Sequence, residues 1–217
     1  IARIPADMPA DAASLLSCGV ITGVGAVVNA GKLRAGEDVV VIGAGGVGLN
    51  AIQGARLAGA RRITAVDMLA DKLEDARAFG ATDVILASDP APWDRLVALT
   101  GRRADAVFVT TGALPAFDTA PHFMAPGGRV VMVGMPAVGA IAGYQPVDLA
   151  GAGQSLIGSK MGDVVIARDI PWLVDLWSQG RLKLEELVSK RWSLEEINEA
   201  MADTRTGGAR RNVIVFD

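Results

Sequence analysis

The sequence contains little of several residue types, and each shortage excludes a class of protein. Among its 217 residues there is one cysteine, Cys18, and one histidine, His122. A lone cysteine cannot form a disulfide within the chain, which excludes a secreted scaffold held together by disulfides. One cysteine and one histidine are also too few for a closed structural zinc site, which normally takes four such ligands.

Charge of one sign and long apolar runs are scarce as well. The net charge is −3, from 21 basic and 24 acidic residues, so no basic surface of the kind that binds nucleic acid is indicated. Apolar runs such as 39–48 fall far short of the roughly 20 residues of a transmembrane helix. The chain starts at Ile1 without a charged-then-apolar signal segment. We therefore expect a cytoplasmic protein with no membrane or nucleic-acid partner, either processed or a piece of a longer chain.

Glycine, by contrast, is abundant and marks the ends of apolar runs. The 26 glycines make up about 12% of the chain, against a typical value of about 7%. Short β-branched and apolar runs predict strands at 39–43, 62–67, 82–86, 105–110, 128–134 and 155–159. Helical patterns fall between them at 46–60, 71–79, 92–99 and 115–124, and a glycine-rich loop extends to 153. This alternation predicts an α/β fold with a doubly wound six-stranded parallel sheet (a Rossmann fold) in the order 3-2-1-4-5-6.

The two ends of the chain have a more amphipathic pattern. Two short helices separated by Gly19 are expected at 10–18 and 23–30, and a further helix at 169–179. Ser193 and Glu196 form a capping box, which predicts a helix with Glu196 at its third position. Extended segments are expected at 187–191 and 212–216. We interpret residues 1–20 and 162–217 as parts of an incomplete second domain around a nucleotide-binding domain at 21–161.

A glycine motif follows the first predicted strand and opens the first helix. Its sequence is Gly43-Ala-Gly45-Gly-Val-Gly48, the GxGxxG pattern of dinucleotide-binding domains. The first glycine permits a tight turn, and the second lets a pyrophosphate approach the backbone. The third allows the helix to pack closely on the sheet. The free N–H groups at the helix start then bind the phosphate oxygens.

An acidic residue stands where such a domain needs one. Asp67 lies nineteen residues after Gly48, at the end of the second predicted strand, where its carboxylate would accept hydrogen bonds from the adenosine ribose. That carboxylate repels a 2′-phosphate, and Met68 and Leu69 supply no arginine, so NAD is favoured over NADP. Lys72 is a further candidate for the ribose or an exposed helix lysine. The alternative for the whole motif is an α/β domain whose glycines only tighten turns.

Several segments together resemble the zinc-dependent medium-chain alcohol dehydrogenases. They are 14–25 (Ser-Leu-Leu-Ser-Cys-Gly-Val-Ile-Thr-Gly-Val-Gly), the loop 43–48, 65–67 (Ala-Val-Asp), 79–83 (Phe-Gly-Ala-Thr-Asp) and the closing 209–215. The similarity covers nearly the whole chain and is greatest to the class III, or thiol-dependent formaldehyde dehydrogenase, branch. These motifs are specific for the superfamily and say little about the substrate.

The resemblance implies roles for individual residues. For the cofactor it implies contacts from the following residues: Gly43, Gly45, Gly46, Val47, Gly48, Asp67, Lys72, Thr111, Gly112, Val133, Gly134, Met135 and Arg211. Thr22 would pack on the nicotinamide, and Arg211 would contact the cofactor phosphates. Residues 159–161 would lie at the inner end of the substrate pocket, where Lys160 departs from the apolar residue of many alcohol-binding members.

The resemblance also implies a catalytic zinc with Cys18 as one of its three protein ligands. Composition alone favours a different interpretation, in which a lone cysteine is a small buried apolar residue. The family's other two ligands, a cysteine and a histidine, belong to an N-terminal catalytic domain, and nothing in this sequence replaces them. His122 falls in the wrong part of the fold and is expected at the surface.

The sequence thus predicts the NAD-binding part of a zinc-dependent alcohol dehydrogenase that lacks the N-terminal catalytic domain. The complete enzyme would transfer hydride between NAD and a primary alcohol, or a thiol–aldehyde adduct. The 217 residues alone would bind NAD and be inactive. A zinc-free quinone-type reductase is the enzymatic alternative, and a non-catalytic NAD-binding fragment is the other. Family members commonly join sheets through their last cofactor-domain strand, so we expect a homodimer.

Overall fold

The chain divides into two compact units. The computed structural model describes residues 1–216, of which 22–164 form one unit. The second unit combines the two ends of the chain, residues 1–21 and 165–217, of which residue 217 lies outside the described part. The sequence-based assignment of 1–20 and 162–217 to the catalytic domain of a dehydrogenase stays a prediction.

The central unit is built on a parallel sheet of six strands in the order β3-β2-β1-β4-β5-β6. The strands are β1 (Asp38–Ile42), β2 (Arg62–Asp67), β3 (Asp83–Leu86), β4 (Ala104–Val109), β5 (Met124–Met132) and β6 (Ser155–Gly158). In the middle of the sheet, Val40 is in register with Thr64 of β2 and with Val107 of β4. The predicted fold class and strand order are confirmed.

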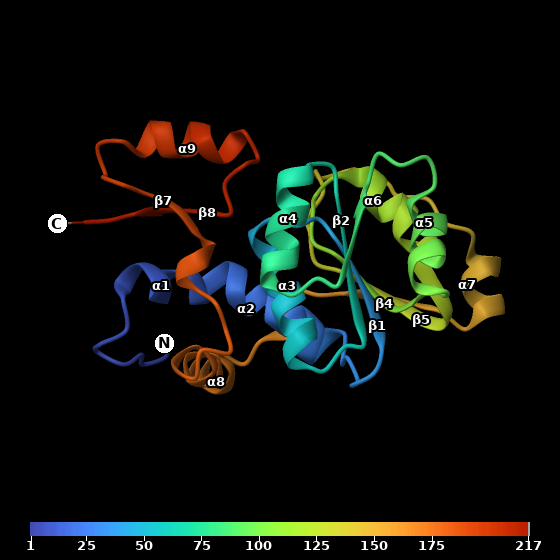
Figure 1. Ribbon diagram of the computed structural model, residues 1–217, viewed down its shortest axis with the longest axis horizontal. Coiled ribbons are helices and arrows are strands. Elements are labelled where there is room, and N and C mark those ends of the chain that lie inside the picture. Colours follow the sequence, from blue (N-terminus) through green and yellow to red (C-terminus); the bar gives the residue numbers. More distant parts are fainter. Residues whose placement is uncertain (217) are drawn as a thin grey trace. The chain divides into compact units, whose positions relative to one another are not determined.

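Helices cover both faces of this sheet. Figure 1 shows α3 (Gly46–Leu57) and α4 (Ala70–Phe79) on one face, and α5 (Pro92–Thr100) and α6 (Leu114–Thr119) on the other. All five residues of β1 are buried, as a strand covered on both faces requires. On the α5 and α6 face, the core includes Val40, Val107 and Phe123. The order of the elements brings the carboxyl ends of β1, β2 and β4 together at one edge.

Two glycines end the helices that the sequence predicts at 71–79 and 92–99. Gly80 and Gly101 follow α4 and α5 with φ of 119° and 80°, the left-handed conformation that glycine adopts most readily. In each case the glycine N–H donates to a carbonyl of the helix's last turn. These caps leave the short turns that lead into β3 and β4.

Other expectations about the helices are wrong. The segment expected to be a loop up to residue 153 contains a helix, α7 (Pro146–Ala152), which begins at a proline and ends at Gly153. The helix expected at 115–124 ends earlier, and a 3-10 turn, η3 (Ala120–Phe123), leads into β5. The two short helices expected around Gly19 are one continuous helix, because glycine at this position keeps a helical backbone. It comprises α1 (Ala10–Leu15), η1 (Leu16–Val20), α2 (Ile21–Gly25) and η2 (Ala26–Ala30).

Because this helix is continuous, it forms a longer apolar segment than the sequence analysis expected. The segment Ala10–Ala30 has 21 residues and a mean hydropathy of 1.7 over its most apolar window, which satisfies the length and composition of a membrane-crossing helix. Buried core helices and signal sequences satisfy the same criteria, and 61% of this window is buried. The expectation that every apolar run falls far short of that length is therefore wrong for this segment.

The terminal unit contains a second, two-stranded parallel sheet. It pairs β7 (Val188–Trp192) with β8 (Arg211–Ile214), and its helices include α8 (Ile166–Ser178) and α9 (Ile197–Arg205). A short 3-10 turn, η5 (Glu185–Leu187), precedes β7, and another, η4 (Met161–Asp163), precedes the unit. Asp11 forms an ion pair with Arg191 of β7, and hydrogen bonds from that guanidinium hold the pKa of Asp11 below its ordinary value.

The capping box in this unit forms only in part. The backbone N–H of Ser193 donates to Glu196 Oε2 at 3.0 Å, as the motif predicts. However, α9 begins at Ile197, so Glu196 is its N-cap residue and not its third residue. The pair closes a turn ahead of the helix, because residues 194–196 have not yet entered the helical hydrogen-bonding pattern.

Charged pairs close the amino edge of the six-stranded sheet. Arg129 of β5 donates to both carboxylate oxygens of Glu37, at 3.1 and 2.6 Å, and its Nε donates to the carbonyl of Gly31. Burial alone would raise the pKa of Glu37, but hydrogen bonds from Arg129 and from the Arg34 N–H outweigh it and hold that pKa below 4.5. Asp38 is similarly joined to Arg61. This edge therefore has its charges paired within the protein.

We predict that Glu37→Gln lowers the free energy of unfolding by about 1–2 kcal/mol at neutral pH, because it leaves Arg129 without its carboxylate. A carboxyl whose pKa is lowered by folding stabilises the protein above its unfolded pKa, and that contribution is lost as the pH falls through the folded value. The deficit of the variant should therefore shrink below pH 4.5. Urea unfolding across pH measures it. Glu74→Gln, in an exposed pair with Arg77, is the control; an equal deficit in the two variants would contradict the prediction.

Candidate functional site

The glycine loop connects β1 to α3 at the carboxyl edge of the sheet. Gly43 has a φ of 96°, a value that a residue with a side chain rarely adopts. A Cβ placed on Gly48 would lie 1.8 Å from the carbonyl oxygen of Gly43, so the first turn of α3 rests directly on the end of β1. A Cβ on Gly45 would meet only Lys72 Nζ, at 3.8 Å. The loop therefore leaves no space for a side chain at Gly48, whereas the space beside Gly45 is free for a ligand.

Asp67 lies beside this loop and is held there by backbone hydrogen bonds. The N–H of Ala44, within the loop, donates to Asp67 Oδ2 at 2.6 Å, and the N–H of Leu69 donates to Oδ1 at 3.1 Å. A carboxylate accepts about four hydrogen bonds, so lone pairs remain for a ligand. Asp67 is half-buried. The structure thus brings the acid and the glycine motif together, nineteen residues apart in sequence.

Lys72 also reaches the loop. It extends from α4, is half-buried, and places its ammonium nitrogen 3.8 Å from the position that a Cβ of Gly45 would occupy. The side chain is therefore not the fully exposed helix lysine that was the alternative. Its positive charge stands on the open side of the loop, where the N–H groups at the start of α3 also favour an anion.

The loops after β4 and β5 are in close backbone contact with each other at the carboxyl edge of the sheet. A Cβ on Gly134 would lie 2.0 Å from the carbonyl oxygen of Thr111, and one on Gly112 would lie 2.6 Å from that of Met135. Val133 is buried behind them, whereas 75% of Met135 is exposed. Four of the predicted cofactor residues are thereby held in one backbone arrangement.

Thr110 is a positioning residue that the sequence prediction missed. Its hydroxyl is within hydrogen-bond distance of the carbonyl oxygens of Gly43, at 2.7 Å, and Ile42, at 3.1 Å, which ties the end of β4 to the glycine loop. A threonine at the end of a strand was visible in the sequence. Its partner was not, because the strand order that places β4 beside β1 is a tertiary property.

A cavity of about 500 Å³ opens next to these groups. Asp67, Gly43 and Thr111 line it, as expected of a ligand site at the point where the strand order reverses. Much of its remaining wall comes from residues that the sequence prediction missed, most of them apolar: Ala87, Asp89, Pro90, Pro92, Trp93, Pro115, Ala116, Thr119 and Phe123. This apolar wall suits a flat ring, and the carboxylate at its rim suits hydroxyl groups.

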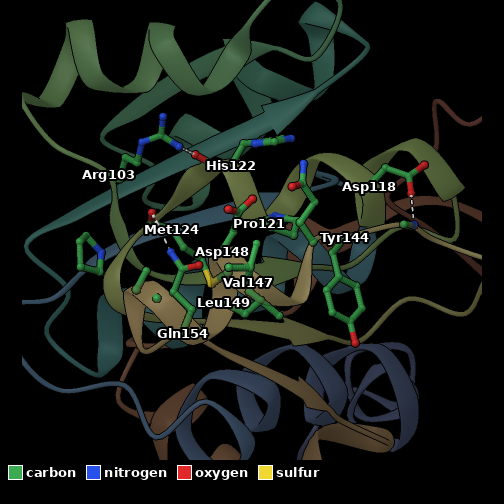
Figure 2. Close-up of a pocket in the computed structure, with 15 residues that line it drawn as sticks. Arg103, Asp118, Pro121, His122, Met124, Tyr144, Val147, Asp148, Leu149 and Gln154 are labelled. Atoms are coloured by element: carbon green, nitrogen blue, oxygen red, sulfur yellow. Dashed lines mark hydrogen bonds between the residues drawn. The ribbon is translucent and has the colours of Figure 1, made fainter.

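A larger cavity, of about 770 Å³, lies elsewhere in the same unit (Figure 2). Its lining includes Arg103, His122, Tyr144 and Asp148, and it contains none of the predicted site residues. His122 is exposed there, as expected, and its ring lies against that of Trp93, with the ring centroids 4.7 Å apart and the ring planes tilted by 39°. Because ligands of open α/β sheets bind at the carboxyl ends of the strands, we assign the site to the smaller cavity.

Four residues singled out in the sequence lie in the long helix and in the segment after β6. Thr22 is buried, and Cys18 is an exposed free thiol, so the composition-based expectation of a buried cysteine is wrong. In the segment after β6, Ser159 is buried and Lys160 is exposed. Among residues 1–216, no group of three or more histidine, cysteine, aspartate or glutamate side chains could hold a metal ion. The described chain does not by itself provide a zinc site.

Arg211, the last predicted cofactor residue, lies in the terminal unit at the start of β8. Its guanidinium is half-buried against Gly19. Within the described residues it has no hydrogen bond or ion pair. Desolvation lowers its pKa, an effect that the charge of neighbouring Cys18 opposes in part. A half-buried cation without an anion is costly, which marks Arg211 as a candidate anion-binding residue.

Comparison with known proteins agrees with this geometry. The model of the zinc-binding dehydrogenase family matches residues 46–179, and the chain belongs to that family. It is 37% identical over 215 residues to the NDMA-dependent alcohol dehydrogenase of Amycolatopsis methanolica, covering 96% of this chain and 57% of the relative. It is 34% identical over 223 residues to S-(hydroxymethyl)glutathione dehydrogenase of Saccharomyces cerevisiae, covering 100% of this chain and 58% of the relative.

Solved structures show the same similarity. The benzyl alcohol dehydrogenase of Acinetobacter calcoaceticus matches with a TM-score of 0.95 and 31% identity, over 100% of this chain and 59% of that one. The resemblance inferred from the sequence is thereby confirmed. The chain spans somewhat more than half the length of the relatives it matches.

We predict different effects from adding the same methyl group to two glycines of the loop. Gly48→Ala should lower the free energy of unfolding by about 1–3 kcal/mol, because its Cβ would meet a backbone oxygen that cannot move freely. Gly45→Ala should change it little, because the space there is open. Urea unfolding of both variants tests this, and equal losses would contradict the close packing of α3 on β1.

Proposed function

We propose that this chain binds NAD at the carboxyl edge of the six-stranded sheet. The observation that carries the proposal is the loop open at Gly45, next to an Asp67 carboxylate that the N–H of Ala44 holds in place. The pyrophosphate would lie on the N-terminus of α3, near the ammonium group of Lys72. The adenosine would occupy the cavity of about 500 Å³, with its ribose hydroxyls donating to Asp67.

The other predicted residues have roles consistent with this placement. The backbone of Val133, Gly134 and Met135 would meet the nicotinamide carboxamide, beside Thr111 and Gly112 at the cofactor cleft. Thr22 would pack on the nicotinamide ring, and the unpaired guanidinium of Arg211 would hold a phosphate. NAD rather than NADP is favoured because Asp67 would repel a 2′-phosphate, and because Met68 and Leu69 offer no positive charge.

For the complete protein we propose hydride transfer between an alcohol and NAD. The alcohol dehydrogenase names of its relatives support the reaction class. A primary alcohol or a thiol–aldehyde adduct is the proposed substrate, and the similarity to S-(hydroxymethyl)glutathione dehydrogenase supports the second. When bound, NAD supplies the hydride acceptor. The residues of this chain orient the cofactor and fix its adenosine end.

Zinc enters only as a proposal for the complete protein. Cys18 is exposed and free, as a ligand supplied to a shared site would be, and the family is described as zinc-binding. Two further protein ligands would have to come from outside this sequence, because a catalytic zinc normally has three. The 217 residues alone are accordingly proposed to bind NAD without turnover, in the cytoplasm, with neither a membrane nor a nucleic-acid partner.

A homodimer is the proposed assembly. Among the described residues, β6 pairs with β5 alone, so its other edge offers free N–H and carbonyl groups to a second strand. The segment before it exposes several large apolar side chains: Val138, Ile141, Tyr144 and Val147. Both features support association of two copies through this end of the sheet.

We predict that Asp67→Ala weakens NAD binding at least ten-fold, because hydrogen bonds from the ribose to a charged group are lost. Preference for NAD over NADP should fall in parallel. Calorimetric titration of the 217-residue chain measures both. Asp71→Ala, an exposed carboxylate in the first turn of α4, is the matched control and should bind like the parent. Unchanged affinity in Asp67→Ala would refute the ribose role.

We predict that the chain has a mass in solution of twice 22.4 kDa. Size-exclusion chromatography with light scattering over a concentration series measures this directly. The monomer mass at every concentration would count against pairing through β6.

A further inference from the structure

His122, the single histidine of the sequence, contacts a residue in the wall of the proposed cofactor cavity. Its imidazole lies against the indole of Trp93, with the ring centroids 4.7 Å apart. Trp93 lines the cavity of about 500 Å³, whereas His122 lines the larger cavity (Figure 2). The indole therefore connects the site proposed for adenosine to a side chain of the type that changes its charge between about pH 5 and 8.

Two consecutive residues of η3 contact this indole. Besides His122, the buried ring of Phe123 meets it edge to face, with centroids 6.3 Å apart and planes at 88°. Phe123 also lines the smaller cavity. Trp93 itself is half-buried, near the start of α5. Of these two ring contacts, the one with His122 can change in strength with pH, because an imidazole gains a charge and a phenyl ring does not.

Protonation strengthens the contact between the imidazole and the indole. A cation within about 6 Å of the centroid of an indole ring is attracted by the negative face of that ring. A neutral imidazole has no net charge to take part in this attraction. A wall residue that is held in place before the ligand arrives lowers the cost of ordering it on binding. A protonated His122 would therefore favour binding at the cavity that Trp93 lines.

Other polar groups surround the imidazole in the larger cavity. Arg103 Nη1 donates to the carbonyl oxygen of His122, and the lining also includes Asp118, Tyr144 and Asp148. Carboxylate, guanidinium and phenol groups of ordinary pKa keep their charge between pH 5.5 and 7.5, so a change in that interval reports on the imidazole. The remaining charged residues on the elements packed against η3 are Asp94 and Arg95 of α5, Asp105 of β4 and Arg129 of β5.

We infer that His122 is a positioning residue for the adenosine end of NAD: its protonated imidazole holds Trp93 at the cavity wall and makes cofactor binding tighter in mild acid. The inference rests on the proposed NAD binding and adds to it two residues and a dependence on pH. Both residues belong to the central unit. His122 itself lines the other cavity and acts on the cofactor through Trp93.

Calorimetric titration of the 217-residue chain with NAD at pH 5.5, 6.5 and 7.5 tests this, because the pyrophosphate keeps its charge over that range. The parent should bind about three-fold more tightly at pH 5.5 than at pH 7.5. His122→Gln should match the parent at pH 7.5 and lack the gain at pH 5.5. His122→Arg, which keeps a planar cation beside the indole, should bind at every pH as the parent does at pH 5.5.

Proton NMR provides a second measurement, because a single histidine gives imidazole signals that need no assignment by mutation. Binding and protonation are reciprocal, so saturating NAD should raise the midpoint of the imidazole titration by about 0.5 pH unit, the same three-fold factor. Trp93→Leu keeps an apolar wall and removes the aromatic ring. It should abolish both this shift and the pH dependence of the affinity.

Other results would overturn the inference. Equal affinity of the parent at pH 5.5 and 7.5 would show that the imidazole positions nothing. A His122→Gln variant that binds more weakly than the parent by the same factor at every pH would show a purely structural role. A pH dependence that persists in Trp93→Leu would show that the imidazole does not act through the indole; if that variant fails to fold, the two His122 variants decide. Absence of NAD binding at every pH would instead refute the proposed function itself.

Discussion

The contact between Gly48 and the carbonyl oxygen of Gly43 is the constraint on which the rest of the central unit depends. It brings the start of α3 onto the end of β1 with no side chain between them, so the free N–H groups of that helix face the carboxyl edge of the sheet. The tight turn also places the N–H of Ala44 against Asp67. One close backbone approach therefore positions both the anion-binding end of the helix and the acid beside it.

Polar groups are paired with one another at the amino edge of the sheet, but only partly hydrogen-bonded at its carboxyl edge. At the amino edge, Glu37 and Arg129 satisfy each other, and Asp38 is joined to Arg61, so little capacity remains for a ligand. At the carboxyl edge, Asp67 is oriented by backbone N–H groups that leave part of its hydrogen-bonding capacity free. Paired charges stabilise the fold, whereas oriented but incompletely satisfied groups suit recognition. The contrast supports the assignment of the proposed site to the smaller cavity, which Asp67 lines.

The sequence predicted elements well where local chemistry decides them. The strand at Arg62–Asp67 and the helix stops at Gly80 and Gly101 depend on β-branched runs and on left-handed glycines, and both signals are local. The sequence-based prediction failed where the surrounding tertiary structure decides the local conformation. Gly19 was expected to break a helix, but the backbone stays helical. The sequence did not predict helix α7, which lies in a glycine-rich segment. None of its residues is buried, so the helix has no apolar face that a sequence pattern could indicate.

The sequence by itself determined the class of the fold, the position of the dinucleotide motif and the family, because spacing along the chain is enough to recognise all three. Only the tertiary structure decided which groups meet. Thr110 ties β4 to the glycine loop, Trp93 and Phe123 wall the cavity, and Arg211 lies on a glycine that is 192 residues away in sequence. These contacts depend on strand order and on chain ends that return to one unit, and neither leaves a pattern in the local sequence.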